Sequence, residues 1–375
     1  MASLPFSRRW RRDKARRRAG LGLALLGLLA PGPLAPPLAE EAILDAGWRT
    51  IFARAATPPA PADNPLTPEK VALGARLFCD PILSRGERSC ASCHRPERAF
   101  SEHRRRAIGL SGRPLARNTP SLFNLAWSKQ YFWDGRAPTL EAQVAMPIED
   151  RKEMHGDWPA ILSRLGREPQ WAAQFRAAFP DEPAPTRAAV LKALASYVRS
   201  LVSPPTRFDA WIAGDDGALA TAEVRGFRLF IGKGGCVLCH VGWRFTDDRF
   251  HDIGLRSNDA GRGALPGSGA GIIQFKTPGL RELTRTAPYM HDGSLPTLAA
   301  VLKHYAGGLR ERPSLATQLN PRLRFTAREK ADLIAFLSSL SQPGAAPRAR
   351  PHALARAPSQ PACRSNFSIS STSRR

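Results

Sequence analysis

Apolar residues recur at helical spacing in several parts of the chain, whereas alternating strand patterns are scarce. Thr67 and Pro68 are typical of a helix start, and Val71, Ala75 and Phe78 then fall on one face. The same kind of pattern begins at three further threonines, which are Thr186, Thr221 and Thr326. These patterns predict an all-α fold of short helices separated by long loops.

A further helix is predicted after Thr297, and it contains Tyr305. Thr297 is a typical cap, and Leu298, Leu302 and Tyr305 then fall on one apolar face before Gly307 ends the helix. Taken alone, the pattern makes Tyr305 a core residue.

The first 39 residues have the form of an export signal. A cationic stretch that ends at Arg18 precedes an apolar run over residues 21–30, and a Pro-rich segment follows with a cleavage point after Ala35 or Ala39. The apolar run is about ten residues, shorter than the roughly 20 that a membrane-spanning helix needs. We therefore predict a signal peptide over 1–39, with an uncleaved anchor as the alternative. The body would then be periplasmic, with no stable membrane insertion after signal removal.

Net charge changes this picture little. The chain has 375 residues, and 55 Lys and Arg against 32 Asp and Glu give a formal net charge of +23. Residues 1–39 carry +7 and residues 344–375 carry +6, which leaves +10 for the residues between them. A mildly basic body attracts acidic partners but does not mark a nucleic-acid binder. Residues 342–375 have no apolar periodicity and predict a disordered basic tail.

Four of the six cysteines lie in two C-x-x-C-H motifs, which are Cys90–His94 and Cys236–His240. The spacing puts two thiols on one helical turn, where each can bond to a vinyl group of a c-type haem with the adjacent His as proximal iron ligand. A redox dithiol has no use for that His, and a zinc site needs a second ligand pair nearby. We therefore predict two haems, attached through Cys90, Cys93, Cys236 and Cys239 and ligated by His94 and His240. We expect Cys79 to be a buried free thiol.

The two motifs divide the body into two regions. The link Ser203-Pro204-Pro205 and the Gly- and Asp-rich residues 214–217 have the composition of a boundary. We predict an N-terminal haem domain over 40–213 that reacts with peroxide and a C-terminal haem domain over 214–341, both cytochrome c-like.

Segments outside the motifs resemble the di-haem cytochrome c peroxidase and MauG family, in the family's order over about residues 65–341. They are Leu77-Phe-Cys-Asp-Pro-Ile-Leu-Ser84, Arg117-Asn-Thr-Pro-Ser-Leu-Phe-Asn124, Phe132-Trp-Asp-Gly-Arg-Ala137, Thr277-Pro-Gly-Leu-Arg281 and Ala287-Pro-Tyr-Met-His-Asp-Gly293. Two haem motifs alone would fit many multihaem cytochromes, but these segments make the resemblance specific.

The resemblance implies roles for single residues. Trp133 matches the tryptophan that conducts electrons between the two haems, although by itself it reads as a core aromatic. Gln143, Pro147 and Glu153 match the distal residues over the N-terminal haem. There a carboxyl group of raised pKa takes and returns the protons of peroxide cleavage. Without the resemblance, Glu153 would be a solvated charge.

Further matches concern calcium and the second haem. Asn118, Thr286 and Pro288 match residues that hold one Ca²⁺ between the domains, and calcium prefers such oxygen ligands. His291 matches a histidine near the second haem.

Within this family, the sixth iron ligand of the second haem distinguishes the peroxidases from the MauG-type members. Family peroxidases place a Met fourteen residues after the histidine that matches His291, whereas MauG-type members place a Tyr, and here that position is Tyr305. Met290 is the alternative ligand. A thioether stabilises ferrous iron, whereas a phenolate stabilises ferric and higher states. Tyr305 therefore favours oxidation of a partner over peroxide scavenging.

At two positions, Leu110 and Gly234, this sequence differs from members of the family that it resembles. Leu110 stands where reductively activated peroxidases carry a distal His, and we expect His103 in that loop to be solvated, so the first haem should be five-coordinate. Gly234 stands where MauG has a surface Trp that relays electrons from its protein substrate. Trp243 is either a substitute for it or a packing residue.

We therefore expect an exported MauG-like oxidoreductase that uses hydrogen peroxide to form high-valent haem and oxidises an external substrate, with protein side chains as one candidate. One alternative is a cytochrome c peroxidase that takes electrons from a small cytochrome. Another is a di-haem electron carrier without enzyme activity. The expected partners are hydrogen peroxide and a periplasmic electron donor or protein substrate.

Overall fold

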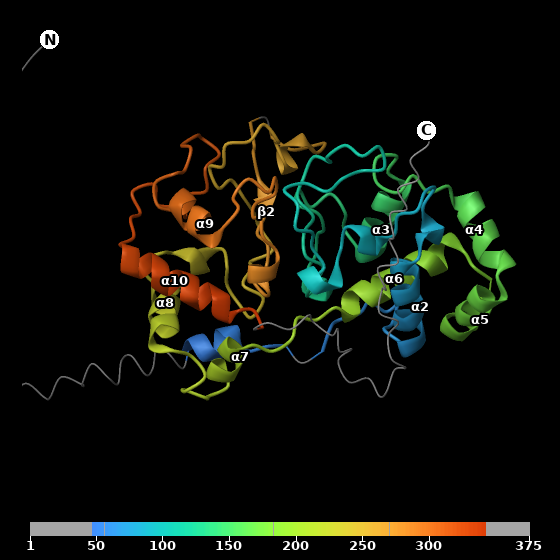
Figure 1. Ribbon diagram of the computed structural model, residues 1–375, viewed down its shortest axis with the longest axis horizontal. Coiled ribbons are helices and arrows are strands. Elements are labelled where there is room, and N and C mark those ends of the chain that lie inside the picture. The colour runs from blue at the N-terminus through green and yellow to red at the C-terminus, as the bar shows by residue number, and fades with distance from the viewer. Residues whose placement is uncertain (1–46, 56, 183, 270, 343–375) are drawn as a thin grey trace, which may run out of the picture. The chain divides into compact units, whose positions relative to one another are not determined.

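The computed structural model describes residues 47–342, apart from residues 56, 183 and 270, and this part of the chain is rich in helices (Figure 1). The α-helices are α2 (Pro68–Cys79), α3 (Leu140–Glu149), α4 (Trp158–Arg167), α5 (Pro169–Ala178), α6 (Arg187–Ser200), α7 (Arg207–Ile212), α8 (Thr221–Ile231), α9 (Leu298–Tyr305) and α10 (Ala327–Ser339). The short 3-10 helices are η1 (Pro81–Leu83), η2 (Cys90–Ser92), η3 (Pro96–Arg98), η4 (Leu125–Trp127), η5 (Cys236–Leu238), η6 (Arg262–Ala264) and η7 (Leu283–Arg285).

The described residues contain little β-structure. Their one sheet consists of two short antiparallel strands, β1 (Phe250–His251) and β2 (Phe275–Lys276). No helix in the described ranges is long and apolar enough to cross a membrane. The signal predicted over 1–39 and the tail predicted over 342–375, except its first residue, lie outside these ranges.

Side-chain caps confirm the helix starts predicted at Thr67, Thr186, Thr297 and Thr326. At the remaining predicted start, α8 begins with Thr221 itself, and Ala220 is the residue before it. Ala300 N donates to Thr297 Oγ1 at 3.1 Å, which satisfies an N–H group that the first turn of α9 leaves without a partner. At α10, Glu329 N donates to Thr326 Oγ1 at 3.2 Å and Thr326 N donates to the Glu329 carboxylate at 2.7 Å. The same cap begins α2 at Thr67 and α6 at Thr186.

Two helix pairs cross in the same way, each at a glycine. Gly74 of α2 lies against α6, and a Cβ at this position would lie 2.0 Å from the Ala193 carbonyl oxygen. Gly226 of α8 lies against α10, and a Cβ there would lie 2.0 Å from the Asp332 carbonyl oxygen. Because α2 and α8 each lead into a C-x-x-C-H motif, the chain repeats one arrangement of paired helices and haem motif.

Each helix pair belongs to its own hydrophobic cluster. The first cluster is built from α2 to α6, and the second from α7 to α10 together with Phe52. The ring centroids of Phe52 lie 5.8 Å from Phe208 and 5.5 Å from Phe227, and the segment 47–52 lies beside α7 in Figure 1. Phe52 and Phe208 precede the predicted boundary at 213/214 yet pack in the second cluster. Where the two domains divide remains a prediction.

Candidate active site

Each C-x-x-C-H motif begins with a 3-10 helix, η2 or η5, and its histidine is the second residue after that helix. His94 N donates to the Cys90 carbonyl at 2.9 Å, and His240 N donates to the Cys236 carbonyl at 2.9 Å. The two motifs therefore have the same local geometry, although 146 residues separate them.

A backbone carbonyl fixes the tautomer of each histidine. His94 Nδ1 lies 2.9 Å from the Phe100 carbonyl oxygen, and His240 Nδ1 lies 2.8 Å from the Phe245 carbonyl oxygen. Because a carbonyl only accepts, Nδ1 must carry the proton. Burial lowers the pKa of both rings, so they are neutral and their Nε2 lone pairs are available to a metal.

The surroundings of the thiols favour a neutral sulfur. Burial raises the pKa of Cys90 to about 12, of Cys93 to about 11 and of Cys236 to about 12. Thiol redox chemistry uses thiolates, so these surroundings disfavour a redox dithiol. Uncharged thioethers and an available Nε2 are what a covalently attached haem requires, and the residues of both motifs fit it.

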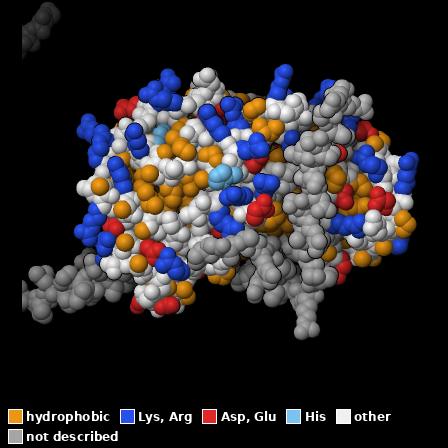
Figure 2. All heavy atoms as spheres, in the orientation of Figure 1, with side chains coloured by type: hydrophobic (Ala, Val, Ile, Leu, Met, Phe, Trp, Pro, Cys, Tyr) orange, Lys and Arg blue, Asp and Glu red, His pale blue; other side chains and the backbone are white. Residues whose placement is uncertain are grey.

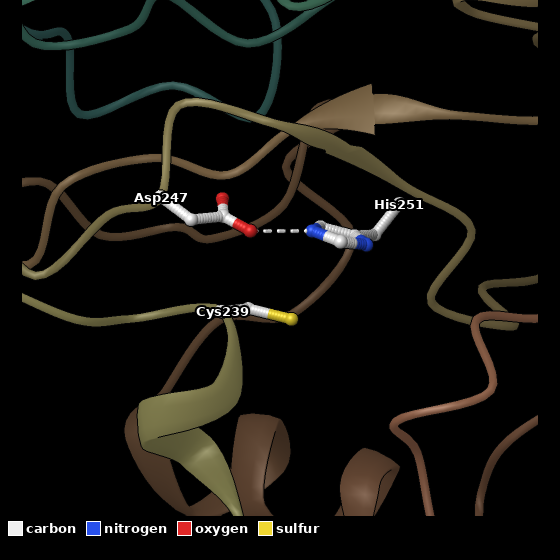
Figure 3. Close-up of side chains that lie close together, drawn as sticks. All are labelled: Cys239, Asp247 and His251. Atoms are coloured by element: carbon white, nitrogen blue, oxygen red, sulfur yellow. Dashed lines mark hydrogen bonds and ion pairs between the residues drawn. The ribbon is translucent and has the colours of Figure 1, made fainter.

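Cys239, Asp247 and His251 lie close together in the second half (Figure 3), with their possible ligand atoms within 4.8 Å of one another. His251 Nε2 donates to Asp247 Oδ2 at 2.7 Å. That hydrogen bond, and next the Cys239 side chain, raise the pKa of His251 to about 9. Burial alone would raise the pKa of Asp247, but hydrogen bonds, first from His251, hold it at about 2. Because we predict that Cys239 attaches a haem, we interpret Asp247 and His251 as an ion pair beside the predicted second haem site.

The first motif opens onto a cavity of about 80 Å³ that is partly open to solvent. The cavity brings together all residues predicted for the first haem and its distal side, namely Cys90, Cys93, His94, Gln143, Pro147 and Glu153. Gln143 and Pro147 are four residues apart on α3, so both reach the same wall. Apolar side chains, among them Phe78 and Leu194, complete the walls.

A tight turn after α3 places Glu153 in this cavity. The Asp150 carboxylate accepts from Lys152 N at 2.6 Å, and the Asp150 carbonyl accepts from Glu153 N at 3.1 Å. The next residue, Met154, is buried, and its carbonyl accepts from Ser84 Oγ at 2.9 Å, which anchors the turn. Burial, and next the charge of Asp150, raise the pKa of Glu153. Glu153 is therefore a half-buried wall residue that holds a proton more readily than a solvated glutamate.

Trp133 joins segments from both halves of the chain. Its Nε1 donates to the Asn118 carbonyl at 2.9 Å, and its own carbonyl accepts from Lys276 N at 2.7 Å. Asn118 N in turn donates to the His291 carbonyl at 2.7 Å. The His291 ring stacks on Phe275 with centroids 3.5 Å apart. The indole thus lies where the first half meets the second.

Tyr305 lies at the end of α9, on the side of the second haem motif. Burial, and next the nearby Cys236 and Cys239, raise the pKa of its phenol. Because the charges of Cys236 and Cys239 affect the pKa of the Tyr305 phenol, this phenol lies near the two residues predicted to attach the second haem. Met290, in contrast, has a left-handed backbone with φ of 73°, which is unusual for a residue with a long side chain.

The residues predicted to hold calcium come from two segments that meet. Asn118 Nδ2 donates to the carbonyls of Arg104 at 3.0 Å and Arg105 at 3.3 Å, which leaves its side-chain oxygen as the atom that can bind a cation. The bond of Asn118 N to the His291 carbonyl holds this residue beside the segment of Thr286 and Pro288. Oxygen donors are present, and calcium binding remains a prediction.

The remaining residues singled out in the sequence differ in exposure and in their contacts. His103 is exposed, and the cavity wall near Leu110 is made by Ile108 and Leu115. Trp243 is 9% exposed and packs edge-to-face on Trp127 with centroids 4.8 Å apart, which favours the packing role. Cys79 is half-buried and disulfide-bonded, so the prediction of a free thiol is wrong.

Sequence reasoning missed several residues of the first site. Tyr197 of α6 lies near Cys90, and burial, and next that thiol, raise the pKa of its phenol. Arg88 lines the cavity near Cys93. The apolar stripe of α6 was the available signal for Tyr197, but a stripe does not reveal which core residue borders a cavity. Nothing in the pattern around Arg88 identifies it.

Known proteins share this arrangement. The sequence profile of di-haem cytochrome c peroxidases matches residues 68–217. The methylamine utilization protein MauG of Methylorubrum extorquens is 48% identical over 305 residues, 80% of this chain and 86% of that protein. The cytochrome c551 peroxidase of Nitrosomonas europaea is 32% identical over 290 residues, 76% of this chain and 83% of that protein. A solved MauG-like protein associated with microbial copper homeostasis has a TM-score of 0.70 and 32% identity, covering 77% of this chain and 94% of that one.

The motifs and the cavity define an oxidoreductase with c-type haem. The chain belongs to the di-haem cytochrome c peroxidase and MauG family. Membership implies two c-type haems and peroxidase chemistry.

Proposed function

We propose that this enzyme is exported to the periplasm and uses hydrogen peroxide to oxidise an external substrate, as a MauG-like enzyme, with protein side chains as one substrate class. One observation carries the proposal. The residues that attach the first haem share a cavity with Gln143, Pro147 and Glu153. The cavity therefore combines a redox site with a carboxyl group that can move protons.

A haem attached at Cys90 and Cys93 would supply the iron that accepts a peroxide oxygen and the electrons that cleave the O–O bond. Glu153 would take the proton from the oxygen nearer the iron and return it to the departing oxygen, which leaves as water. Its raised pKa suits both transfers, because one group must accept and then donate the same proton. The Gln143 amide on the same wall would orient the peroxide by a hydrogen bond.

Two residues support oxidation of an external substrate. Trp133, hydrogen-bonded to segments of both halves, would pass electrons from the second haem site to the first. Tyr305 would bind the second iron through its phenolate, and an anionic oxygen ligand stabilises the ferric and higher states. An iron held in this way is a poor acceptor for electrons from a small cytochrome. It would instead be suited to hold one of the oxidising equivalents that peroxide generates at the first site.

The second candidate is a cytochrome c peroxidase, which the 32% identity to a cytochrome c551 peroxidase favours. Steady-state assays separate the two. We expect the resting diferric holoprotein to consume stoichiometric peroxide without prior reduction and to oxidise reduced cytochrome c slowly. Rapid cytochrome c oxidation that begins only after one haem has been reduced would instead establish the second candidate.

A further inference from the structure

A second cavity, of about 510 Å³ and partly open to solvent, has a strongly basic lining. Arg105 and Arg106 come from the loop after the first haem motif, whereas Arg256 and Arg310 come from the second half of the chain. All four side chains are exposed. Basic side chains are also prominent over the face drawn in Figure 2. We call this site the arginine cavity.

The two aspartates of the arginine cavity already have partners. Asp259 accepts from Arg117 Nε at 2.6 Å and from Arg117 Nη2 at 2.9 Å. Burial would raise the pKa of Asp259, but these hydrogen bonds hold it below its usual value, so its charge is matched by an arginine outside the lining. Asp292 lies 3.8 Å from Arg105 and accepts from Ser294 N at 3.0 Å.

Three arginines are left without a matching charge. Within the described part of the chain, no ion pair joins Arg106, Arg256 or Arg310 to a carboxylate. Like charges that share one cavity repel each other unless a counter-charge enters. The planar guanidinium groups bind carboxylates through paired N–H donors.

One loop contributes to the linings of both the arginine cavity and the first haem cavity. In the loop after the first motif, Ile108 and Leu115 line the first haem cavity, whereas their near neighbours Arg106 and Ala116 line the arginine cavity. On the other side, Ser257 lines the arginine cavity and its Oγ lies 3.2 Å from His291 Nε2.

We propose that the arginine cavity binds carboxylate groups, held by Arg106, Arg256 and Arg310. The carboxylates have two possible sources. They are either the propionates of an attached haem, which reach over from a neighbouring site, or a free small polycarboxylate from solution. The inference goes beyond the proposed function, because it concerns binding and not peroxide chemistry.

The test uses the di-haem holoprotein and citrate as the probe, at low ionic strength and without peroxide. Calorimetry would measure citrate binding to the wild type and to Arg106→Gln, Arg256→Gln and Arg310→Gln. Arg322→Gln is the matched control, because Arg322 is exposed and lies outside the lining. For a free polycarboxylate we expect the cavity variants to bind citrate about tenfold more weakly each, the loss typical of one charge-assisted hydrogen bond, and the control to bind it normally.

Spectroelectrochemistry of the same proteins distinguishes the other source. If propionates fill the cavity, citrate does not bind, and each cavity variant lowers the reduction potential of a haem more than Arg322→Gln does, because a nearby positive charge is lost. Haem absorbance and circular dichroism check that each variant is loaded and folded. Citrate binding and reduction potentials that are the same in the cavity variants as in the control would overturn the proposal. Because no peroxide is used, that result would leave the proposed function untouched.

Discussion

Glu153→Gln is the substitution that most sharply tests the proton transfer at the first haem site. The amide keeps the shape of the side chain and its place on the cavity wall but cannot take a proton. Among the described residues, Glu153 is the one carboxyl group that lines this cavity, and the nearby Asp150 is exposed, so no other described carboxyl group can replace it there. Loss of a positioned acid–base group typically costs about 10²- to 10⁴-fold in rate, or about 3–5 kcal/mol in activation free energy.

Stopped-flow absorption after mixing diferric holoprotein with hydrogen peroxide measures this rate. We expect at least a 10²-fold slower reaction for Glu153→Gln, with the haem spectrum of the resting protein unchanged. Glu87→Gln is the matched control, because Glu87 is exposed and outside the cavity, and should react at the wild-type rate.

The pH dependence gives a second readout of the same group. Glu153 must be ionised to accept the peroxide proton, so the rate should fall as the pH drops through its pKa. Because burial raises that pKa, the fall begins at a higher pH than for an ordinary glutamate. The fall should vanish in Glu153→Gln. A variant that keeps both the wild-type rate and the wild-type pH profile would refute the role given to Glu153.

Three further predictions concern the second half of the chain. Tyr305→Phe should change the visible spectrum of the second haem and leave that of the first unchanged, and an unchanged second spectrum would remove Tyr305 as a ligand. Gly226→Ala should destabilise the holoprotein by about 1–3 kcal/mol in thermal unfolding, because its Cβ would meet the Asp332 carbonyl at 2.0 Å. The control Gly166→Ala has open space and should be neutral or slightly stabilising, so equal losses in both would contradict the packing argument. The stabilisation by His251 is measured as the difference in unfolding free energy from His251→Gln. It should be full below about pH 6.5 and disappear as the pH rises through the folded pKa, which the hydrogen bond to Asp247 raises. A pH-independent difference would rule out the ion pair.

Local signals in the sequence predicted local features well. The threonine caps located the helix starts, because a cap depends on a few adjacent residues. The spacing within each C-x-x-C-H motif predicts haem attachment for the same reason, and both motifs have the same backbone hydrogen bond from His to the first Cys. The resemblance located Gln143, Pro147 and Glu153, which the cavity then brought together.

Features that depend on tertiary packing were not predictable in this way. The carbonyls of Phe100 and Phe245 reach the histidines only because each loop folds back on its motif. The glycine crossings at Gly74 and Gly226 depend on helices more than 100 residues further along the chain. The arginine cavity combines side chains from positions 105 to 310, and no sequence window contains them.

The central claim is that a peroxide site and a tyrosine-ligated second haem work as one oxidant. Mössbauer spectroscopy of the iron-57-labelled diferric holoprotein, after one equivalent of hydrogen peroxide, tests it directly. We predict that both iron signals change and that two oxidising equivalents per molecule remain on the irons until a substrate removes them. A change confined to one iron, or no change before an external reductant is added, would contradict it.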